Sequence, residues 1–164
     1  MAKLVSKVYG EALFEAAIEA GTVDSLMEEV DAVLAIFRAN EEYIKLLNHP
    51  KIPVEEKVAL LEEAFKGKAS NQLVGLLTAT VEKGRFAEIE NILAYFESKV
   101  LEYKKIGIAH VTSASALTDQ QKEEVQKRLL ETTSYESIQT EYQVDASLIG
   151  GIVIQIGDRV VDGS

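Results

Sequence analysis

Residues 144–164 read VDASLIGGIVIQIGDRVVDGS, and this stretch decides the fold class of the C-terminal part of the chain. From Ile152 to Ile156 the residues alternate with the two-residue period of a β-strand. Gly157-Asp158 is a hairpin signal, and Val160-Val161 follow as the return strand. Because the stretch contains no catalytic side chain, it indicates a structural sheet and directs the search for function to surfaces.

Two further strands and a helix are predicted upstream of this hairpin. Residues 106–113 are rich in β-branched side chains and residues 138–144 alternate between apolar and polar, so each predicts a strand. Between them, Thr118 and Gln121 form a capping box that opens a helix over residues 118–132. The C-terminal part is therefore predicted to be a small α/β domain with a mixed sheet and a hairpin.

The N-terminal part carries the 3.6-residue periodicity of α-helices and predicts a six-helix bundle. The first helix is ended by Gly21, the second is capped by Thr22, the third spans residues 41–47, the fourth starts at Pro53, the fifth is capped by Ser70, and the sixth spans residues 86–104. The fold class is thus α+β. The change in character places the boundary near Ile106, between domains of residues 1–105 and 106–164.

The first helix has little polar surface. Its predicted core seam includes Val8, and its polar residues form one narrow stripe made of Lys7, Glu11, Glu15 and Glu19. Such a helix either lies at the centre of a bundle or shares an apolar face with a partner.

Composition excludes several classes of partner. The 17 basic and 27 acidic residues give a net charge of −10, which disfavours nucleic acid and anionic lipid. A partner with basic amphipathic helices fits better, but the simpler and favoured interpretation is that the acidity only keeps the protein soluble. No apolar run is long enough to insert into a membrane, no signal or transit peptide is visible, and the absence of Cys excludes disulfides and thiolate sites.

No catalytic, cofactor-binding or metal-binding residues are predicted. His49 and His110 lie in different predicted domains, so structural or surface roles are expected for both. The pair Gly150-Gly151 is not followed by the Lys-Ser or Lys-Thr of a phosphate-binding loop. Since a nucleophile, a base and an orienting group do not occur together in any recognisable pattern, the chain is not expected to be an enzyme.

Three motifs, spread in order over nearly the whole chain, carry a family resemblance. They read VYGEALF at residues 8–14, EKGR at 82–85, and LIGGIVIQIGD at 148–158 followed by DGS at 162–164. They resemble the delta subunit of F-type ATP synthases, whose mitochondrial counterpart is the oligomycin-sensitivity-conferring protein. Gly10 stands where this family usually has alanine, which weakens the helix there.

The resemblance implies a non-catalytic connector, or stator, subunit. It would link the alpha subunits of the catalytic head to the b subunits of the peripheral stalk and support the coupling of proton flow to ATP synthesis. Its implied location is the cytoplasmic face of the bacterial cell membrane, as a peripheral protein. The alternative is a generic helical adaptor that binds an amphipathic partner helix.

The resemblance also implies two contact regions. A groove between the first and fifth helices would accept the N-terminal helix of an alpha subunit, with small residues allowing close approach. The candidate residues are Tyr9, Ala12, Leu13, Ala16, Leu76, Ala79 and Thr80. Without the resemblance, all seven could be intramolecular core. In the second region, the hairpin and the helix over 118–132 would contact the C-terminus of the b subunits, where no single residue stands out.

The C-terminal residues Asp162-Gly163-Ser164 read like the lead-in to another helix, with Ser164 as its N-cap. The family continues there with a basic helix. The resemblance therefore implies that this chain is truncated and that the intact protein is less acidic.

Overall fold

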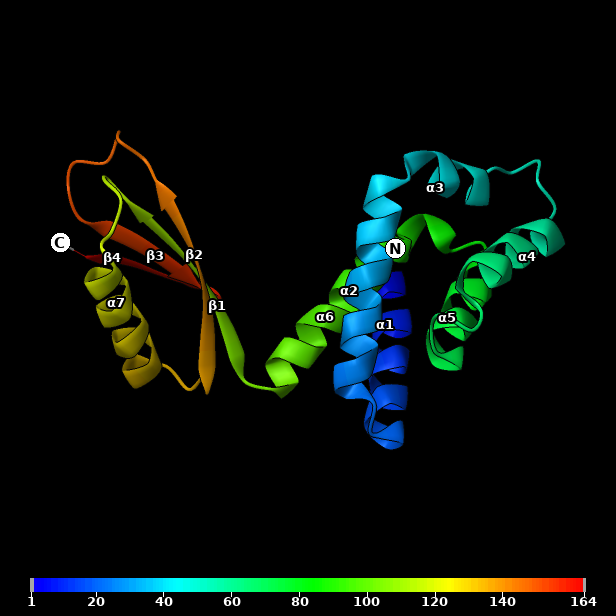
Figure 1. Cartoon of the computed structure of the whole chain (residues 1–164), viewed down its shortest axis with the longest axis horizontal. Coiled ribbons are helices and arrows are strands. Elements are labelled where there is room, and N and C mark those ends of the chain that lie inside the picture. The colour runs from blue at the N-terminus through cyan, green and yellow to red at the C-terminus, as the bar shows by residue number, and fades with distance from the viewer. Residues whose placement is uncertain (1, 164) are drawn as a thin grey trace. The chain divides into compact units, whose positions relative to one another are not determined.

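The computed structural model describes residues 2–163 and contains, over that range, seven α-helices, one 3-10 helix and four β-strands (Figure 1). In order these are α1 (Ala2–Ala20), α2 (Val23–Ala39), α3 (Glu41–Leu47), α4 (Val54–Phe65), α5 (Asn71–Glu82), η1 (Phe86–Glu88), α6 (Ile89–Tyr103), β1 (Ile106–Ser113), α7 (Asp119–Thr132), β2 (Ser137–Val144), β3 (Ile152–Ile156) and β4 (Arg159–Gly163). The α+β class is confirmed. Ser164, expected to cap a further helix, lies outside the described residues.

Contacts divide the chain into two units, Met1–Val100 and Leu101–Ser164. The division falls inside α6, a few residues before the boundary expected from the change to strand character. The last buried residue of α6 is Val100, and the following turn, which includes the exposed Tyr103, no longer contributes to the helical core. The end of apolar burial therefore marks the division better than the end of the helix.

The core of the first unit is centred on helix α5 and on the buried rings of Phe37, Phe65 and Phe86. Helix α5 packs against α1, α2 and α4. The ring of Phe37 on α2 is only 1% exposed and meets the rings of Phe65 and Phe86 edge-on, each at a centroid distance of 5.8 Å. Edge-to-face contacts of buried rings add to the hydrophobic stabilisation of the same area. These contacts join α2 to α4 and to η1.

The junction of α1 and α2 differs from the prediction in one respect. Gly21 ends α1 with a φ of 67°, a left-handed conformation that glycine adopts without strain. Thr22, however, makes no side-chain cap for α2. Its hydroxyl donates instead to Oε1 of Gln72 on α5, at 3.2 Å. The capping prediction is therefore wrong, because a partner distant in sequence engages the hydroxyl.

Two other predicted helix starts can be compared directly. The hydroxyl of Ser70 accepts a hydrogen bond from the Leu73 N–H, so the predicted cap of α5 is confirmed. Pro53 lies one residue before α4 rather than at its first position, with a ψ of 146° that keeps it extended.

Gly10 allows α1 and α6 to approach closely. A Cβ atom placed on Gly10 would lie 2.6 Å from Cδ1 of Tyr95 and 3.2 Å from the carbonyl oxygen of Ile92. The Tyr95 hydroxyl also donates to Oε1 of Glu11, at 3.0 Å. The tyrosine ring therefore occupies the space that a side chain at position 10 would need.

This packing predicts opposite effects for alanine at two helical glycines. Gly75 on α5 has nothing within 4 Å of its Cβ position, so Gly75→Ala is expected to stabilise the chain by about 1 kcal/mol through helix propensity. Gly10→Ala gains the same propensity but is expected to destabilise by about 1–3 kcal/mol, because the ring of Tyr95 must move. Urea unfolding followed by far-ultraviolet circular dichroism measures both, and stabilisation by Gly10→Ala would contradict the close approach.

Helices α2 and α6 also meet through two carboxyl groups. The side chains of Asp31 and Glu97 are hydrogen-bonded to each other. Burial, followed by this hydrogen bond and by the charge of Asp31, raises the pKa of Glu97 to about 7, while the Arg38 guanidinium acts in the opposite direction. Glu97 is therefore protonated in mildly acidic solution, and its carboxyl group shares a hydrogen bond with the Asp31 carboxylate.

This pair predicts that the first unit loses stability as the pH rises. The unfolded chain releases the proton of Glu97 near its ordinary pKa of 4.5, whereas the folded chain keeps it up to about 7. The stabilisation is complete below 4.5 and is lost between 4.5 and 7. Since Glu97 is only half-buried, solvent screening reduces the expected loss to about 1 kcal/mol. Glu97→Gln should flatten the pH dependence of the free energy of unfolding between pH 4.5 and about 7, and Glu102→Gln on the same helix should not. Equal profiles for the two variants would contradict the carboxyl pair.

The second unit is a four-stranded mixed sheet in the order β2-β1-β3-β4. Strand β1 runs parallel to β2 and antiparallel to β3, and β3 and β4 form the predicted hairpin. Helix α7 connects the parallel pair and lies along one face of the sheet (Figure 1). It opens with the predicted capping box, in which both the Thr118 and the Gln121 bonds are present.

The two faces of this sheet differ. Under α7, Leu129 packs with Ala109, Ile138 and Ile156 in a small buried cluster. On the other face, Nδ1 of His110 lies 3.0 Å from Oε2 of Glu141, and both side chains are more than half exposed. Burial on one face and polar residues on the other is common in sheets with antiparallel strands.

Candidate partner-binding site

The first candidate surface is the junction of α1 and α5. Gln72, near the start of α5, donates from Nε2 to the carbonyl oxygen of Ala16 at 3.2 Å, while its Oε1 accepts from the Thr22 hydroxyl. The α5 residues Leu73 and Leu77 are fully buried. Gln72 therefore joins α5 to α1 by a hydrogen bond, next to buried apolar residues of α5. We refer to the outer side of this junction as the α1–α5 surface.

The seven predicted residues fall into two groups. Leu13, Leu76 and Thr80 are 4%, 9% and 0% exposed, and the Thr80 hydroxyl donates to the carbonyl oxygen of Leu77 at 2.7 Å. These three are buried within the helical unit and offer almost no surface to a partner. The remaining four have accessible surface, with Ala12 exposed and the others half-buried, namely Tyr9, Ala16 and Ala79. Of the seven, only the residues of this second group have enough accessible surface to contact a partner.

The sequence analysis missed part of the α1–α5 surface. Leu4 and Val8 on α1 are 61% and 55% exposed, although Val8 was predicted to belong to the core seam. They precede Ala12 and Ala16 at intervals of four residues, so all four lie along one side of α1. The narrow polar stripe of this helix was the available signal, since it left more apolar residues than one core face can bury.

A small residue extends the surface on α5. Gly75 is exposed and lies one turn before Ala79, hence on the same side of the helix. Its Cβ position is open space. Alanine on both helices and glycine on α5 allow another backbone to come close, and Leu4 and Val8 supply apolar area. This combination suits an amphipathic helix laid along the junction.

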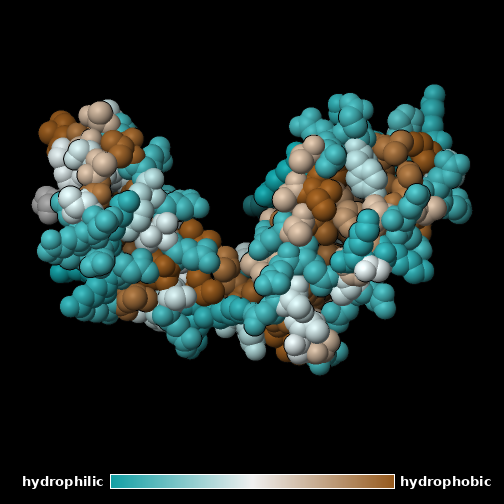
Figure 2. Space-filling model, in the orientation of Figure 1, coloured by the Kyte–Doolittle hydropathy of each residue, from teal (hydrophilic) through white to brown (hydrophobic). Residues whose placement is uncertain are grey.

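Exposed acidic residues lie beside the α1–α5 surface, together with the exposed lysines Lys3, Lys7 and Lys83. Glu15 and Glu19 near the end of α1 and Glu82 at the end of α5 are exposed. Complementarity across an interface steers association and fixes orientation, so a helix with basic residues beside its apolar face fits this surface. Figure 2 shows that hydrophobic and hydrophilic residues are interspersed on the visible face of the molecule.

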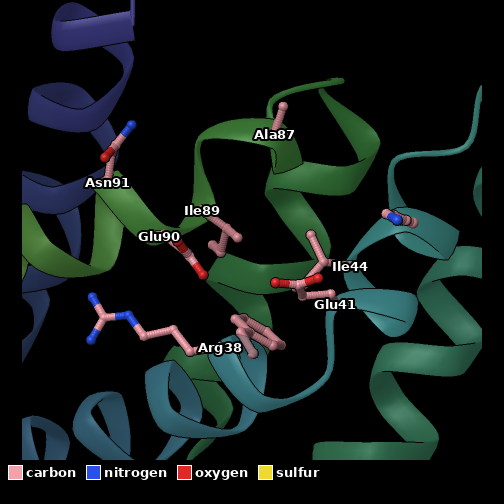
Figure 3. A pocket seen from close by; sticks show the side chains of 9 residues that line it. Arg38, Glu41, Ile44, Ala87, Ile89, Glu90 and Asn91 are labelled. Carbon is pink, nitrogen blue, oxygen red and sulfur yellow. The ribbon is translucent and has the colours of Figure 1, made fainter.

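A hollow of about 500 Å³ in the first unit lies where α2, α3 and the start of α6 meet. Figure 3 shows Arg38 at its side and the carboxylates of Glu41 and Glu90 pointing into the same space. The rest of the lining consists of Phe37, Ile44, Lys45, Ala87, Ile89 and Asn91. The lining contains no hydroxyl, thiol or imidazole group.

Two further features of the described residues bear on function. Across residues 2–163, no group of three or more His, Cys, Asp and Glu side chains is placed to hold a metal ion. No helix within the same range is both long and apolar enough to cross a lipid bilayer.

Comparison with known proteins relates the chain to one family. A family model described as ATP synthase delta (OSCP) subunit matches residues 5–164. The ATP synthase subunit delta of Lachnoclostridium phytofermentans is 52% identical over 164 residues, covering 100% of this chain and 90% of that protein. The subunit of the same name from Halalkalibacterium halodurans is 35% identical, covering 98% and 87%.

A solved structure shows the same fold at low identity. A chain in the cryo-EM structure of the Toxoplasma gondii mitochondrial ATP synthase hexamer matches with a TM-score of 0.74 and 17% identity, covering 97% of this chain and 89% of its own. Because a family model and full-length relatives agree with the three motifs, the chain belongs to the ATP synthase delta (OSCP) subunit family.

Proposed function

We propose that this chain is the non-catalytic connector of a bacterial F-type ATP synthase, joining the catalytic head to the peripheral stalk. Family membership over residues 5–164 is the observation that carries the proposal. In this role, rotation of the central shaft applies torque to the head, and the connector resists that torque. Proton flow is thereby coupled to ATP synthesis and not lost as slippage.

The head contact is assigned to the helical part, residues 1–105, as a six-helix bundle. The N-terminal helix of an alpha subunit lies along the α1–α5 surface, against Ala12, Ala16 and Ala79, with Tyr9 beside it. Leu13, Leu76 and Thr80 support this surface from below. The exposed Leu4 and Val8 support the assignment, because solvent-exposed aliphatic side chains on one helix side gain from burial. A stable junction requires roughly 1,000 Å² of buried area or more.

The stalk contact is assigned to the α/β part, residues 106–164. Its partner is the C-terminal region of the b subunits, and the hairpin β3–β4 and α7 supply the contact. Exposed apolar side chains on the hairpin, Val160 at 63% and Val161 at 39%, support this assignment. With its partners in place, the chain is a peripheral protein at the cytoplasmic face of the cell membrane.

Binding to the two partners separately tests this function. The purified chain is mixed with immobilised alpha-subunit N-terminal peptide in one arm and with the soluble C-terminal half of the b subunit in the other. We expect retention in both arms and formation of a ternary complex. Retention by the alpha peptide alone would overturn the stalk assignment, and retention in neither arm would overturn the connector function as a whole.

A further inference from the structure

Strand β2 forms an open edge of the sheet in the second unit. Within the described sheet only β1 pairs with it. Val144 pairs with Ser113, and the N–H of the next residue, Asp145, donates to the Ser113 carbonyl oxygen at 2.8 Å. Residues of a strand in a parallel pair alternately turn their backbone groups toward and away from the neighbour. Ile138, Thr140 and Tyr142 therefore turn their backbone groups to the open edge.

One side chain already occupies this edge. Nε2 of Gln126 on α7 donates to the carbonyl oxygen of Ile138 at 2.7 Å. An amide N–H from outside the sheet thus satisfies the first outward acceptor of β2. The corresponding groups of Thr140 and Tyr142 lie farther along the same edge, where an added strand would continue the pattern.

A hollow of about 510 Å³ lies beside this edge, between α7 and β2. Leu130, itself 37% exposed, and the ring of Tyr142 give it apolar lining. The side chains of Lys122 and Lys127 also line it, against a single acid, Glu123. The ammonium group of Lys122 lies 4.7 Å from the centre of the Tyr142 ring. In a chain with net charge −10, this hollow has a local excess of positive charge.

Strand β2 has only part of the protection that open edges usually have. Natural edges are shielded by proline, by bulges, by charged side chains (lysine above all), or by a covering element. Here Gln126 covers the position of Ile138, and Glu141 is the one charged residue of the strand. The residues Ser137–Val144 read SIQTEYQV and contain neither proline nor lysine. They pair with β1 in unbroken register along the whole strand.

From this edge and its hollow we infer that β2 receives an extended segment of a partner protein as a fifth strand of the sheet. The side chains of that segment alternate, so those on the α7 side enter the hollow. An apolar residue packs on Leu130 and Tyr142, and an acidic residue two positions away faces Lys122 and Lys127. The inference goes beyond the proposed function, because it specifies a binding mode whichever protein supplies the segment.

A designed peptide tests the inference. The probe is acetylated, amidated and as long as β2, which has 8 residues, with threonine alternating with Glu, Leu, Glu and Val in that order. It is titrated into the full 15N-labelled chain and followed by NMR. We expect the amide signals of Ile138, Thr140 and Tyr142 to shift, and their exchange with water to slow. Replacing both Glu residues of the probe by Lys should weaken binding about tenfold.

Two modified probes separate strand addition from loose association. N-methylation of the peptide at alternate residues removes either the N–H groups that face β2 or those that face away. Only the first set should abolish the shifts. Equal effects of both sets, or shifts confined to other surfaces, would overturn the inference. Shifts at the β2 edge that grow with protein concentration in the absence of peptide would also overturn it, since a second copy would then be the occupant.

Variants of the chain complete the test. Lys127→Glu should reverse the charge preference of the binding site, so that the probe with Lys binds better than the probe with Glu. The matched variant Lys83→Glu, at an exposed residue of the first unit, should leave the preference unchanged. Thr140→Pro should prevent binding with little loss of fold, because its N–H points away from β1. Binding that survives in Thr140→Pro, or a preference that does not respond to Lys127→Glu, would refute strand addition.

Discussion

Ala79→Arg is expected to abolish binding of the alpha-subunit N-terminal peptide. Ala79 is half-buried on α5, one turn after Gly75, where the proposed partner helix comes closest. An arginine there obstructs the approach by its bulk and adds a positive charge to a surface that is proposed to receive a basic helix. We expect affinity to fall at least about 100-fold, which corresponds to ~2.7 kcal/mol. Isothermal titration of the full chain with the peptide measures this loss.

Ala12→Arg on the facing side of α1 should have the same effect. Because Ala12 is exposed, this variant should change the free energy of unfolding by no more than about 0.5 kcal/mol. The matched control is Ala59→Arg, an exposed alanine on α4, which should bind the peptide normally. Unaltered affinity in both Ala12→Arg and Ala79→Arg would mean that the head contact lies elsewhere on the helical unit.

The elements that could be predicted from the sequence are those set by local chemistry. Strand β1 spans Ile106–Ser113 as expected, and the hairpin turns at Gly157-Asp158. Thr118 and Gln121 are three residues apart, so their capping box depends only on neighbours in the chain. Such signals survive in the folded protein because no distant residue competes with them.

Contacts between distant residues escaped prediction. The Thr22 hydroxyl is taken by Gln72, so a good local cap is not used. The ring of Tyr95 makes Gly10 a packing position, although its sequence context suggested only a weaker helix. Likewise, nothing in either segment identifies the carboxyl pair of Asp31 and Glu97. Each depends on how two helices cross, which periodicity does not specify.

For the α1–α5 surface, the sequence identified the two helices but not which residues are accessible. A residue in an apolar seam can face the core or a partner with the same spacing. Leu13 and Val8 illustrate the difference, since the first is 4% and the second 55% exposed on the same helix. Their distribution follows from the direction in which α5 packs on α1, and that direction appears only in the folded unit.

Gly107→Ala is expected to cause a large loss of stability confined to the second unit. Gly107 is buried on β1, and a Cβ atom there would lie 2.6–2.8 Å from three carbons of the Tyr135 ring. Tyr135 packs against the small buried cluster under α7, so expelling the ring exposes much of that cluster. We expect a cost of about 2–4 kcal/mol. Hydrogen exchange of β1 amides measures it, with the amides of α5 as an internal control that should not change.

A double-mutant cycle with Tyr135 decides whether the ring is the cause. In a Tyr135→Ala background the space above Gly107 is empty, so Gly107→Ala should cost less than about 0.5 kcal/mol and could even stabilise the strand. The coupling between the two positions should therefore nearly equal the cost of Gly107→Ala alone. If Gly107→Ala costs the same in both backgrounds, glycine is needed for the backbone of β1 and not for the ring. Since Gly107 has no positive φ in this structure, backbone conformation gives no separate reason for glycine, and packing against Tyr135 remains its explanation.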